Sequence, residues 1–371
     1  MILKTDCIHF PGDRPCFANK QFGKTCNDCE YYKKVGENIL IIKFDAIGDV
    51  LRTTSILPAI KREFPESRVS WLTKSNATDI FIGNGLVDEV LAVENNFTLP
   101  KLLSQNFDLI LHPDANPVSS AYAKIIPAKE KRGFTLDDKG KVQVCNEEAI
   151  EWFEMGAFDQ LKKANKKTYQ EIIHSLLKLK YRKDEIILNL TEEEINFREN
   201  FFNENKLDRF KFIVGLNTGG SRRWKYKKWR IEGFKEVIKA LSENTEIGIL
   251  LFGGEIEIEL VNTLKSFSDR VIDTGTNNSL RQFFSLIELV DVLVTGDTLA
   301  LHAATALNKR VICLFGPTSS NEIEDYGRII KITPDMDCLV CYKQDCDFVP
   351  NCMDKITSDM ILEKINSLIK F

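Results

Sequence analysis

Short apolar stretches rich in β-branched residues alternate with amphipathic stretches in two parts of the chain. The first part predicts strands at residues 38–44, 68–72, 89–93 and 107–112, with helices at 50–64, 77–83 and 99–104. The second part predicts strands at 212–216, 246–252, 270–273, 292–294 and 310–315, with helices at 231–241, 258–266, 280–290 and 301–307. Strands that alternate with helices form parallel, doubly wound sheets. We therefore expect two α/β halves that bind a ligand in the cleft between them.

The same pattern divides the chain into four segments. Residues 1–35 lack apolar periodicity and form a cysteine-rich appendage; residues 36–205 and 206–335 are the two α/β domains. Residues 336–371 are a second cysteine-rich segment that ends in a helix. Helices are also expected at 169–179 and 191–203, whereas 140–165 has no clear rhythm. The length of 371 residues agrees with two domains.

Charge and hydropathy narrow the class of protein. The 50 basic and 54 acidic side chains give a net charge of −4, which argues against a general nucleic-acid-binding protein. No apolar run reaches the roughly 18 residues that span a bilayer, and Asp6, His9 and Asp13 lie where a signal peptide would be apolar. We expect a cytoplasmic protein, with peripheral contact to the inner membrane as an open alternative. The basic stretch 162–183 would face an anionic membrane or an anionic acceptor, or be an ordinary solvated helix.

Gly48 and Asp49 form a turn between a predicted strand and a predicted helix. The backbone N–H groups at the start of such a helix attract anions. Asp49 has two interpretations: it caps the helix, or it acts as a general base.

Two turns in the second half have similar features. Residues 217–221 are rich in glycine and hydroxyl groups and precede six basic residues within nine positions, which favours phosphate binding. A solvated basic face is the simpler alternative. Binding of single-stranded nucleic acid, which the interleaved aromatic residues suggest, is a weaker alternative.

Asp297 and Thr298 precede an apolar helix that contains His302. Asp297 and Thr298 would bind a phosphate or a sugar, or they would only cap the helix. A single histidine such as His302 more often has a structural role than a catalytic one. The chain has neither a P-loop nor the G-x-G-x-x-G fingerprint of dehydrogenases.

The ten cysteines include two groups of four. Four closely spaced thiolates suit a structural Zn²⁺ or Fe site, and the C-terminal group has the more specific spacing. The N-terminal group is a weaker candidate, and the two groups could form one shared site. The alternative is that all are reduced thiols without a ligand. The candidate metal ligands are Cys338, Cys341, Cys346 and Cys352, and then Cys7, Cys16, Cys26 and Cys29.

Three motifs between about residues 38 and 330 resemble those of the bacterial heptosyltransferases of glycosyltransferase family 9. The stretch 41–53 (IIKFDAIGDVLRT) is similar to the opening of that family. The stretch 296–306, followed by Leu-Phe-Gly-Pro-Thr at 314–318, is similar to its C-terminal signature, and Arg223-Trp224 with 227–229 (KKW) is similar to its basic phosphate-binding motif. The order and spacing of the motifs make the resemblance specific.

The resemblance implies a GT-B fold of two Rossmann-like domains, and transfer of a heptose from ADP-heptose to a lipopolysaccharide core sugar. The anomeric centre would be inverted without a catalytic metal. Asp49 would be the general base, and Lys227 would neutralise the leaving diphosphate. The other donor-binding positions would be Thr218, Ser221, Lys228, Glu255, Asp297, Thr298 and His302. The acceptor-binding positions would be Gly48, Arg52 and Arg132.

Two features depart from the core heptosyltransferases. The cysteine groups are similar to the iron-binding element of the autotransporter heptosyltransferases, which brings in a protein acceptor as an alternative to a glycolipid. Arg230 follows Trp229 where the family usually has proline, so the loop geometry could differ. Two further alternatives remain. The enzyme would use a different nucleotide sugar, or the chain would be a non-catalytic, metal-stabilised nucleotide-binding protein.

Overall fold

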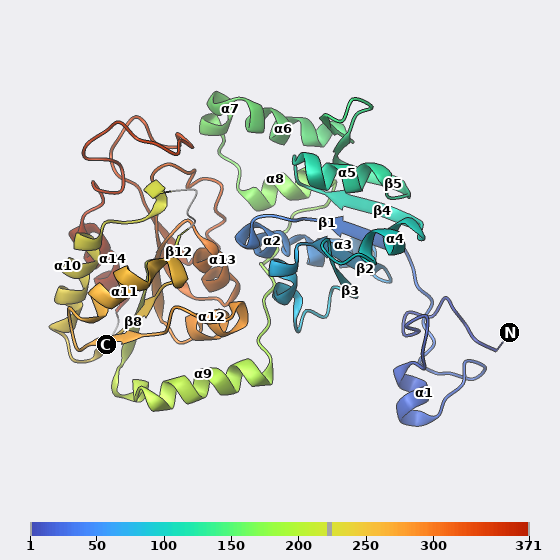
Figure 1. Cartoon of the computed structure of the whole chain (residues 1–371), viewed down its shortest axis with the longest axis horizontal. Helices are drawn as coiled ribbons and strands as arrows, with labels where there is room; N and C mark the ends of the chain where they lie inside the picture. Colours follow the sequence, from blue (N-terminus) through green and yellow to red (C-terminus); the bar gives the residue numbers. More distant parts are fainter. Residues whose placement is uncertain (1, 221–224, 370–371) are drawn as a thin grey trace.

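The structure of the protein is a computed structural model that describes residues 2–220 and 225–369. It contains two six-stranded sheets, one in each half of the chain (Figure 1). The first sheet has the strand order β3-β2-β1-β4-β5-β6, and only β6 runs antiparallel to its neighbour. Its strands are β1 (Asn38–Ile42), β2 (Arg68–Thr73), β3 (Glu89–Ala92), β4 (Phe107–His112), β5 (Ala128–Leu136) and β6 (Val142–Val144).

The second sheet is parallel throughout, with the order β12-β11-β10-β7-β8-β9. Its strands are β7 (Phe212–Asn217), β8 (Ile247–Phe252), β9 (Val271–Asp273), β10 (Val292–Gly296), β11 (Arg310–Leu314) and β12 (Ile329–Ile332). The expected α/β architecture of doubly wound halves is therefore confirmed. Sequence reasoning missed β5, β6 and β12, whose charged or short segments lack a clear apolar run.

Helices cover both faces of each sheet (Figure 1). In the first half they are α2 (Ile47–Thr53), α3 (Ile56–Glu63), η1 (Ser75–Phe81), α4 (Thr98–Leu103), α5 (Pro117–Ile125), η2 (Glu147–Ala149), α6 (Ile150–Ala157), α7 (Asp159–Ala164) and α8 (Tyr169–Leu176). In the second half they are α9 (Glu192–Glu204), η3 (Leu207–Arg209), η4 (Lys225–Lys227), α10 (Ile231–Ser242), η5 (Glu255–Glu257), α11 (Ile258–Lys265), α12 (Leu280–Ile287) and α13 (Leu299–Ala306).

Two of the predicted helices differ from the structure. The helix expected at 50–64 is two helices, α2 and α3, separated at Thr54 and Ser55. Pro58 lies in the first turn of α3, where a missing N–H group costs little, whereas one long helix would place it in the interior. The helix expected at 77–83 is the 3₁₀ helix η1, which begins two residues earlier.

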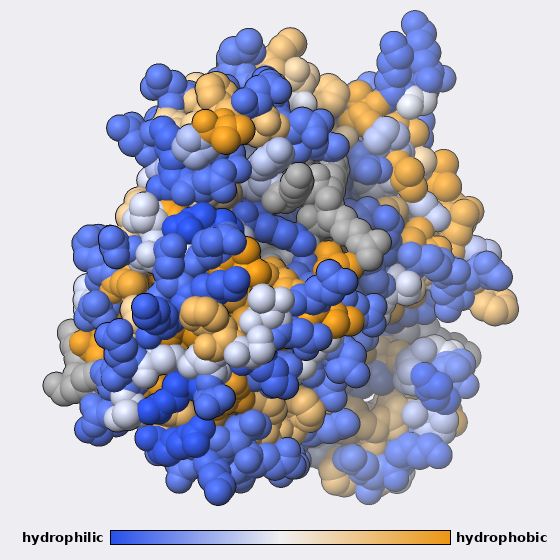
Figure 2. Space-filling model, turned by 60° about the vertical axis from the view of Figure 1, so that its left-hand side comes forward, coloured by the Kyte–Doolittle hydropathy of each residue, from blue (hydrophilic) through white to orange (hydrophobic). Residues whose placement is uncertain are grey.

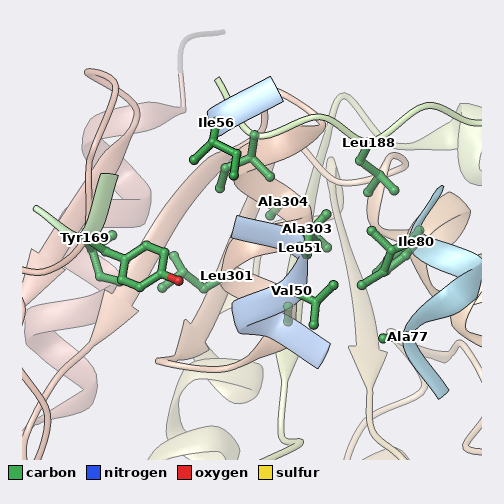
Figure 3. Close-up of a cluster of buried hydrophobic side chains, with 14 of the residues drawn as sticks. Val50, Leu51, Ile56, Ala77, Ile80, Tyr169, Leu188, Leu301, Ala303 and Ala304 are labelled. Carbon is green, nitrogen blue, oxygen red and sulfur yellow. The ribbon is translucent and has the colours of Figure 1, made fainter. Parts of the chain in front are cut away.

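The two halves pack against each other through α2 and α13 (Figure 3). Val50 and Leu51 of α2 lie beside Leu301, Ala303 and Ala304 of α13 in one buried apolar cluster. The approach is close at Gly48, where an added Cβ would lie 3.1 Å from His302 Cδ2 and 3.4 Å from Leu299 Cα. A side chain at position 48 would therefore push the halves apart where they meet at the cleft.

The two cysteine-rich segments have different positions. The N-terminal appendage contains α1 (Phe17–Phe22) and lies apart from the first sheet (Figure 1). The C-terminal segment ends in α14 (Ser358–Leu368), which packs on α10. Ile356 is fully buried in the core of the second half, and its carbonyl accepts a hydrogen bond of 2.9 Å from Trp229 Nε1.

The surface in Figure 2 is mainly hydrophilic, with hydrophobic residues in small groups. Within the described ranges, no helix combines the length and the apolar character that a bilayer-spanning segment needs.

Candidate active site

A cleft of about 1080 Å³ lies between the two halves, where loops at the carboxyl ends of both sheets meet. The first half contributes the β1–α2 turn, including Asp49 and Arg52. The second half contributes Lys227, Asp297 and the start of α13. The structure thus brings together residues that are up to about 250 positions apart in the sequence.

Asp49 is in the first turn of α2 and faces the cleft. Its Oδ2 accepts a hydrogen bond of 3.1 Å from the Ala46 N–H, and its Oδ1 lies 2.8 Å from the Arg52 guanidinium. Burial opposes ionisation of this carboxyl, but the positive charges of Arg52 and Lys43 outweigh burial and hold its pKa well below the usual range. Asp49 therefore both caps its helix and presents a charged carboxylate to the cleft.

A buried ion pair that sequence reasoning missed supports the β1–α2 turn. Lys43 Nζ lies 2.6 Å from Asp114 Oδ1 and also donates a hydrogen bond to the Asp45 carbonyl oxygen. The Phe44 N–H donates to the other Asp114 oxygen at 3.4 Å. The sequence shows a lysine at the end of a buried strand, which indicates a buried charge. The pair was not predicted because the partner, Asp114, is 71 residues away.

On the opposite wall, Lys227 Nζ lies 2.7 Å from Asp297 Oδ2. Burial opposes ionisation of Asp297, but the charge of Lys227 lowers its pKa. Thr298 is the N-cap of α13, and its hydroxyl accepts a hydrogen bond of 3.3 Å from the Ala300 N–H. Asn217 Nδ2, at the end of β7, donates to the same hydroxyl at 3.3 Å. This wall combines a cation with the N-terminus of a helix, which suits a phosphate.

His302 lies on α13 where the two halves meet, and it is buried. Burial and the nearby charge of Arg52 lower the pKa of its imidazole to about 4. His302 is therefore neutral at pH 7 and does not add positive charge to the cleft.

The pKa of His302 predicts a loss of stability in mild acid. Below about pH 6.5 the imidazole of His302 binds a proton in the unfolded chain but not in the folded protein. The free energy of unfolding therefore has its full value above pH 6.5 and decreases as the pH falls towards 4. The expected total is about 3 kcal/mol. Urea unfolding of wild type and His302→Gln at pH 7.5, 6 and 5 measures the part lost by pH 5, about 2 kcal/mol. Carboxylates with lowered pKa titrate mainly below that range. Parallel pH dependences of the two proteins would refute the prediction.

The other predicted site residues lie in several places. Gly48 and Arg52 line the cleft, whereas Thr218 and Lys228 line a small pocket that adjoins it. Arg132 lies on β5, is not among the cleft-lining residues, and pairs with Glu130 at 2.8 Å and Glu63 at 3.5 Å. Its acceptor role stays a prediction. Ser221 lies outside the described residues.

Glu255 is exposed and is not among the cleft-lining residues, and its contact with a nucleotide stays a prediction. Glu257 is buried, lines the cleft and lies 2.6 Å from Lys228 Nζ. Its second oxygen accepts a hydrogen bond of 3.1 Å from the Gly254 N–H. Glu257 thus accepts a hydrogen bond from the N-cap residue of η5, and Gly254 has no side chain that a capping signature in the sequence would require.

All ten cysteines are unpaired thiols. Across residues 2–220 and 225–369, no three Cys, His, Asp or Glu side chains are grouped so that they could hold a metal ion. In the C-terminal group, however, burial and the proximity of Cys341 and Cys346, and then Cys338, raise the pKa of Cys352 to about 11. Binding of a metal ion by these cysteines stays a prediction.

Comparison with known proteins agrees with this architecture. The model of glycosyltransferase family 9 (heptosyltransferase) matches residues 98–350. Lipooligosaccharide heptosyltransferase 2 of Haemophilus influenzae is 22% identical over 90% of this chain and 99% of its own length. A family 9 glycosyl transferase from Veillonella parvula superposes with a TM-score of 0.70 at 16% identity, covering 90% of this chain and 97% of the other. ADP-heptose lipopolysaccharide heptosyltransferase II of Escherichia coli superposes with a TM-score of 0.66 at 17% identity, covering 89% and 98%.

The fold and the cleft define a glycosyltransferase of the GT-B type, as the sequence motifs implied. More particularly, the chain belongs to glycosyltransferase family 9, the heptosyltransferases.

Proposed function

We propose that this protein transfers a heptose from ADP-heptose to a lipopolysaccharide core sugar with inversion of the anomeric centre. The observation that carries the proposal is the placement of Asp49 on one wall of the cleft and the Lys227–Asp297 pair on the other. ADP-heptose and lipopolysaccharide occur in the names of similar proteins that are 22% identical to this chain or less. Their assignment to this chain is part of the proposal.

The donor would lie along the second half of the molecule. Its diphosphate would bind between Lys227 and the N-terminus of α13, which Thr298 caps. The nucleoside would extend towards Gly254 and Glu257, which line the cleft after β8. A buried carboxylate there can accept hydrogen bonds from ribose hydroxyl groups.

The reaction needs a base on one side of the anomeric carbon and positive charge on the other. Asp49 would accept the proton from the acceptor hydroxyl as its oxygen attacks the anomeric carbon. The bond to the diphosphate breaks, and Lys227 and the helix N–H groups stabilise the charge that develops on the leaving ADP. Arg52 holds the Asp49 carboxylate on the cleft side of α2.

Two measurements test the proposal. The first is the melting temperature of the protein with ADP, UDP, GDP and CMP at matched concentrations, since a ligand that binds only the folded state raises it. The second is transfer of heptose from ADP-heptose to lipopolysaccharide that lacks heptose, followed by mass spectrometry. Selective stabilisation by ADP with a product one heptose heavier supports the proposal. Selective stabilisation by UDP or GDP would replace the donor and contradict it.

We also propose that Cys338, Cys341, Cys346 and Cys352 bind a structural Zn or Fe ion when the metal is supplied. The close spacing of these four thiols in the sequence supports this. Binding requires loss of the thiol protons and a rearrangement that brings the sulfur atoms together. Protein purified under reducing conditions is expected to contain about one equivalent of metal by elemental analysis, and a Cys341→Ser/Cys346→Ser variant is expected to lose it. A Cys145→Ser variant is the control. Less than a tenth of an equivalent in wild type would contradict the proposal.

A further inference from the structure

The loop after β11 borders one end of the cleft, because β11 lies on the side of β10 away from β7 and β8. This end is formed by Thr318, Ser319 and Glu322, which follow β11, together with Lys162 of α7 and Tyr342 of the C-terminal cysteine-rich segment. The nucleoside and diphosphate would occupy the opposite end and the middle. In an inverting transfer the acceptor hydroxyl attacks from the side opposite the leaving diphosphate, so this end is where the acceptor sugar has room.

Tyr342 is held at this end by several bonds. The Ser319 N–H donates a hydrogen bond of 3.2 Å to the Tyr342 hydroxyl, which donates in turn to Glu322 Oε1 at 3.0 Å. The Tyr342 N–H donates to the Pro317 carbonyl at 2.9 Å. Lys162 Nζ approaches the ring from the first half, 3.8 Å from its centroid. The cysteine-rich segment is therefore part of the cleft wall and meets the other half of the molecule there.

The backbone of this segment is strained where it carries Tyr342. Val340 has a φ of 58° and Tyr342 a φ of 50°, on either side of Cys341. This left-handed region is unfavourable for residues with a Cβ, and most of all for β-branched valine. Such strain persists where surrounding contacts fix the conformation, and it is concentrated at ligand-binding sites.

Thr318 gives a second, independent observation. It is buried, it lines the cleft, and in the part of the chain that the structure describes its hydroxyl oxygen has no hydrogen-bond partner. A buried hydroxyl without a partner costs free energy. A ligand hydroxyl that reaches it when the Lys162–Tyr342 contact opens would remove that cost.

This end is also connected to the proposed base. The Tyr169 N–H donates to the Glu322 carbonyl at 2.9 Å, and the Arg52 guanidinium stacks on the Tyr169 ring at 3.6 Å. Arg52 pairs with Asp49. This end of the cleft is thus linked to the proposed base through Tyr169 and Arg52.

From these contacts we infer that Thr318, Glu322, Tyr342 and Lys162 form the binding site for the acceptor sugar. The inference rests on the proposed function. Hydroxyl, carboxylate and ammonium groups offer both donors and acceptors, as a polyhydroxylated sugar ring requires. The cysteine-rich segment would then determine acceptor choice through Tyr342.

The test compares Thr318→Val, Tyr342→Phe and Lys162→Met with the controls Thr263→Val and Tyr32→Phe, which lie outside the cleft. With deacylated, heptose-free lipopolysaccharide as the acceptor, each cleft variant is expected to raise the acceptor KM about five- to tenfold. The KM for ADP-heptose and the stabilisation by ADP should stay within twofold. Thr318→Val should melt no lower than wild type, because it removes only an unpartnered hydroxyl. Equal effects on both KM values, or a lowered melting temperature with unchanged KM, would show a merely structural role.

Binding without turnover separates this inference from the proposed function. Saturation-transfer NMR of Asp49→Asn protein with the same deacylated acceptor should show binding that Thr318→Val and Tyr342→Phe weaken. Binding by a protein whose wild type transfers no heptose would contradict the proposed function and support the acceptor site. Absence of binding, or binding that the variants do not change, would overturn the acceptor site.

Discussion

Asp49→Asn is expected to lower kcat by about a hundred- to ten-thousandfold, because a positioned general base contributes that much to a proton transfer. The amide keeps the size of the side chain but cannot accept the proton of the acceptor hydroxyl. Stabilisation by ADP should persist, since the proposed diphosphate site lies on the other wall of the cleft. Steady-state kinetics with ADP-heptose and a heptose-free acceptor measure the loss.

Two controls accompany Asp49→Asn. The change leaves the guanidinium of Arg52 without its partner at 2.8 Å, and this guanidinium is largely buried, so thermal unfolding must show that the variant is folded at the assay temperature. Asp138→Asn removes an exposed carboxylate that pairs only with Lys124 in the described structure, and it should keep wild-type activity. Wild-type kcat in folded Asp49→Asn would exclude Asp49 as the base.

Lys227→Met is expected to lower kcat by about a hundred- to a thousandfold and to weaken stabilisation by ADP. The ammonium group would stabilise charge on the leaving diphosphate, and losing one such donor has effects of this size in other enzymes. The variant also leaves Asp297 without the ion pair at 2.7 Å, so the pKa of Asp297 should rise. Kinetics and ADP-dependent melting measure both effects.

Lys227→Arg and Lys265→Met are the matched variants for this prediction. Arginine keeps the charge and should recover part of the activity, whereas Lys265 is an exposed lysine of the same half that pairs with Asp273 at 3.4 Å. Its replacement should change nothing. Equal activity of Lys227→Met and wild type would contradict the proposed position of the diphosphate.

The α/β class, most of the buried strands and the turns that carry chemistry follow from local sequence pattern. β1 and β7 are continuous apolar runs, so their type follows from local pattern alone. Asp297 and Thr298 directly follow β10, and Asp49 lies in the first turn of the helix after β1. The carboxyl ends of parallel strands are where ligands bind. These residues were therefore predictable, and the structure places all three at one cleft.

Which distant groups meet depends on how the elements pack in three dimensions. The Lys43–Asp114 pair and the contact between Lys162 and Tyr342 join segments that no local pattern connects. Glu257 lines the cleft and Glu255 is exposed because of how η5 turns. Arg132 is placed outside the cleft by its position on β5, a strand that local pattern does not predict. The physical reason is that hydropathy encodes which side of an element is buried, whereas the partner of each polar group depends on how the elements pack.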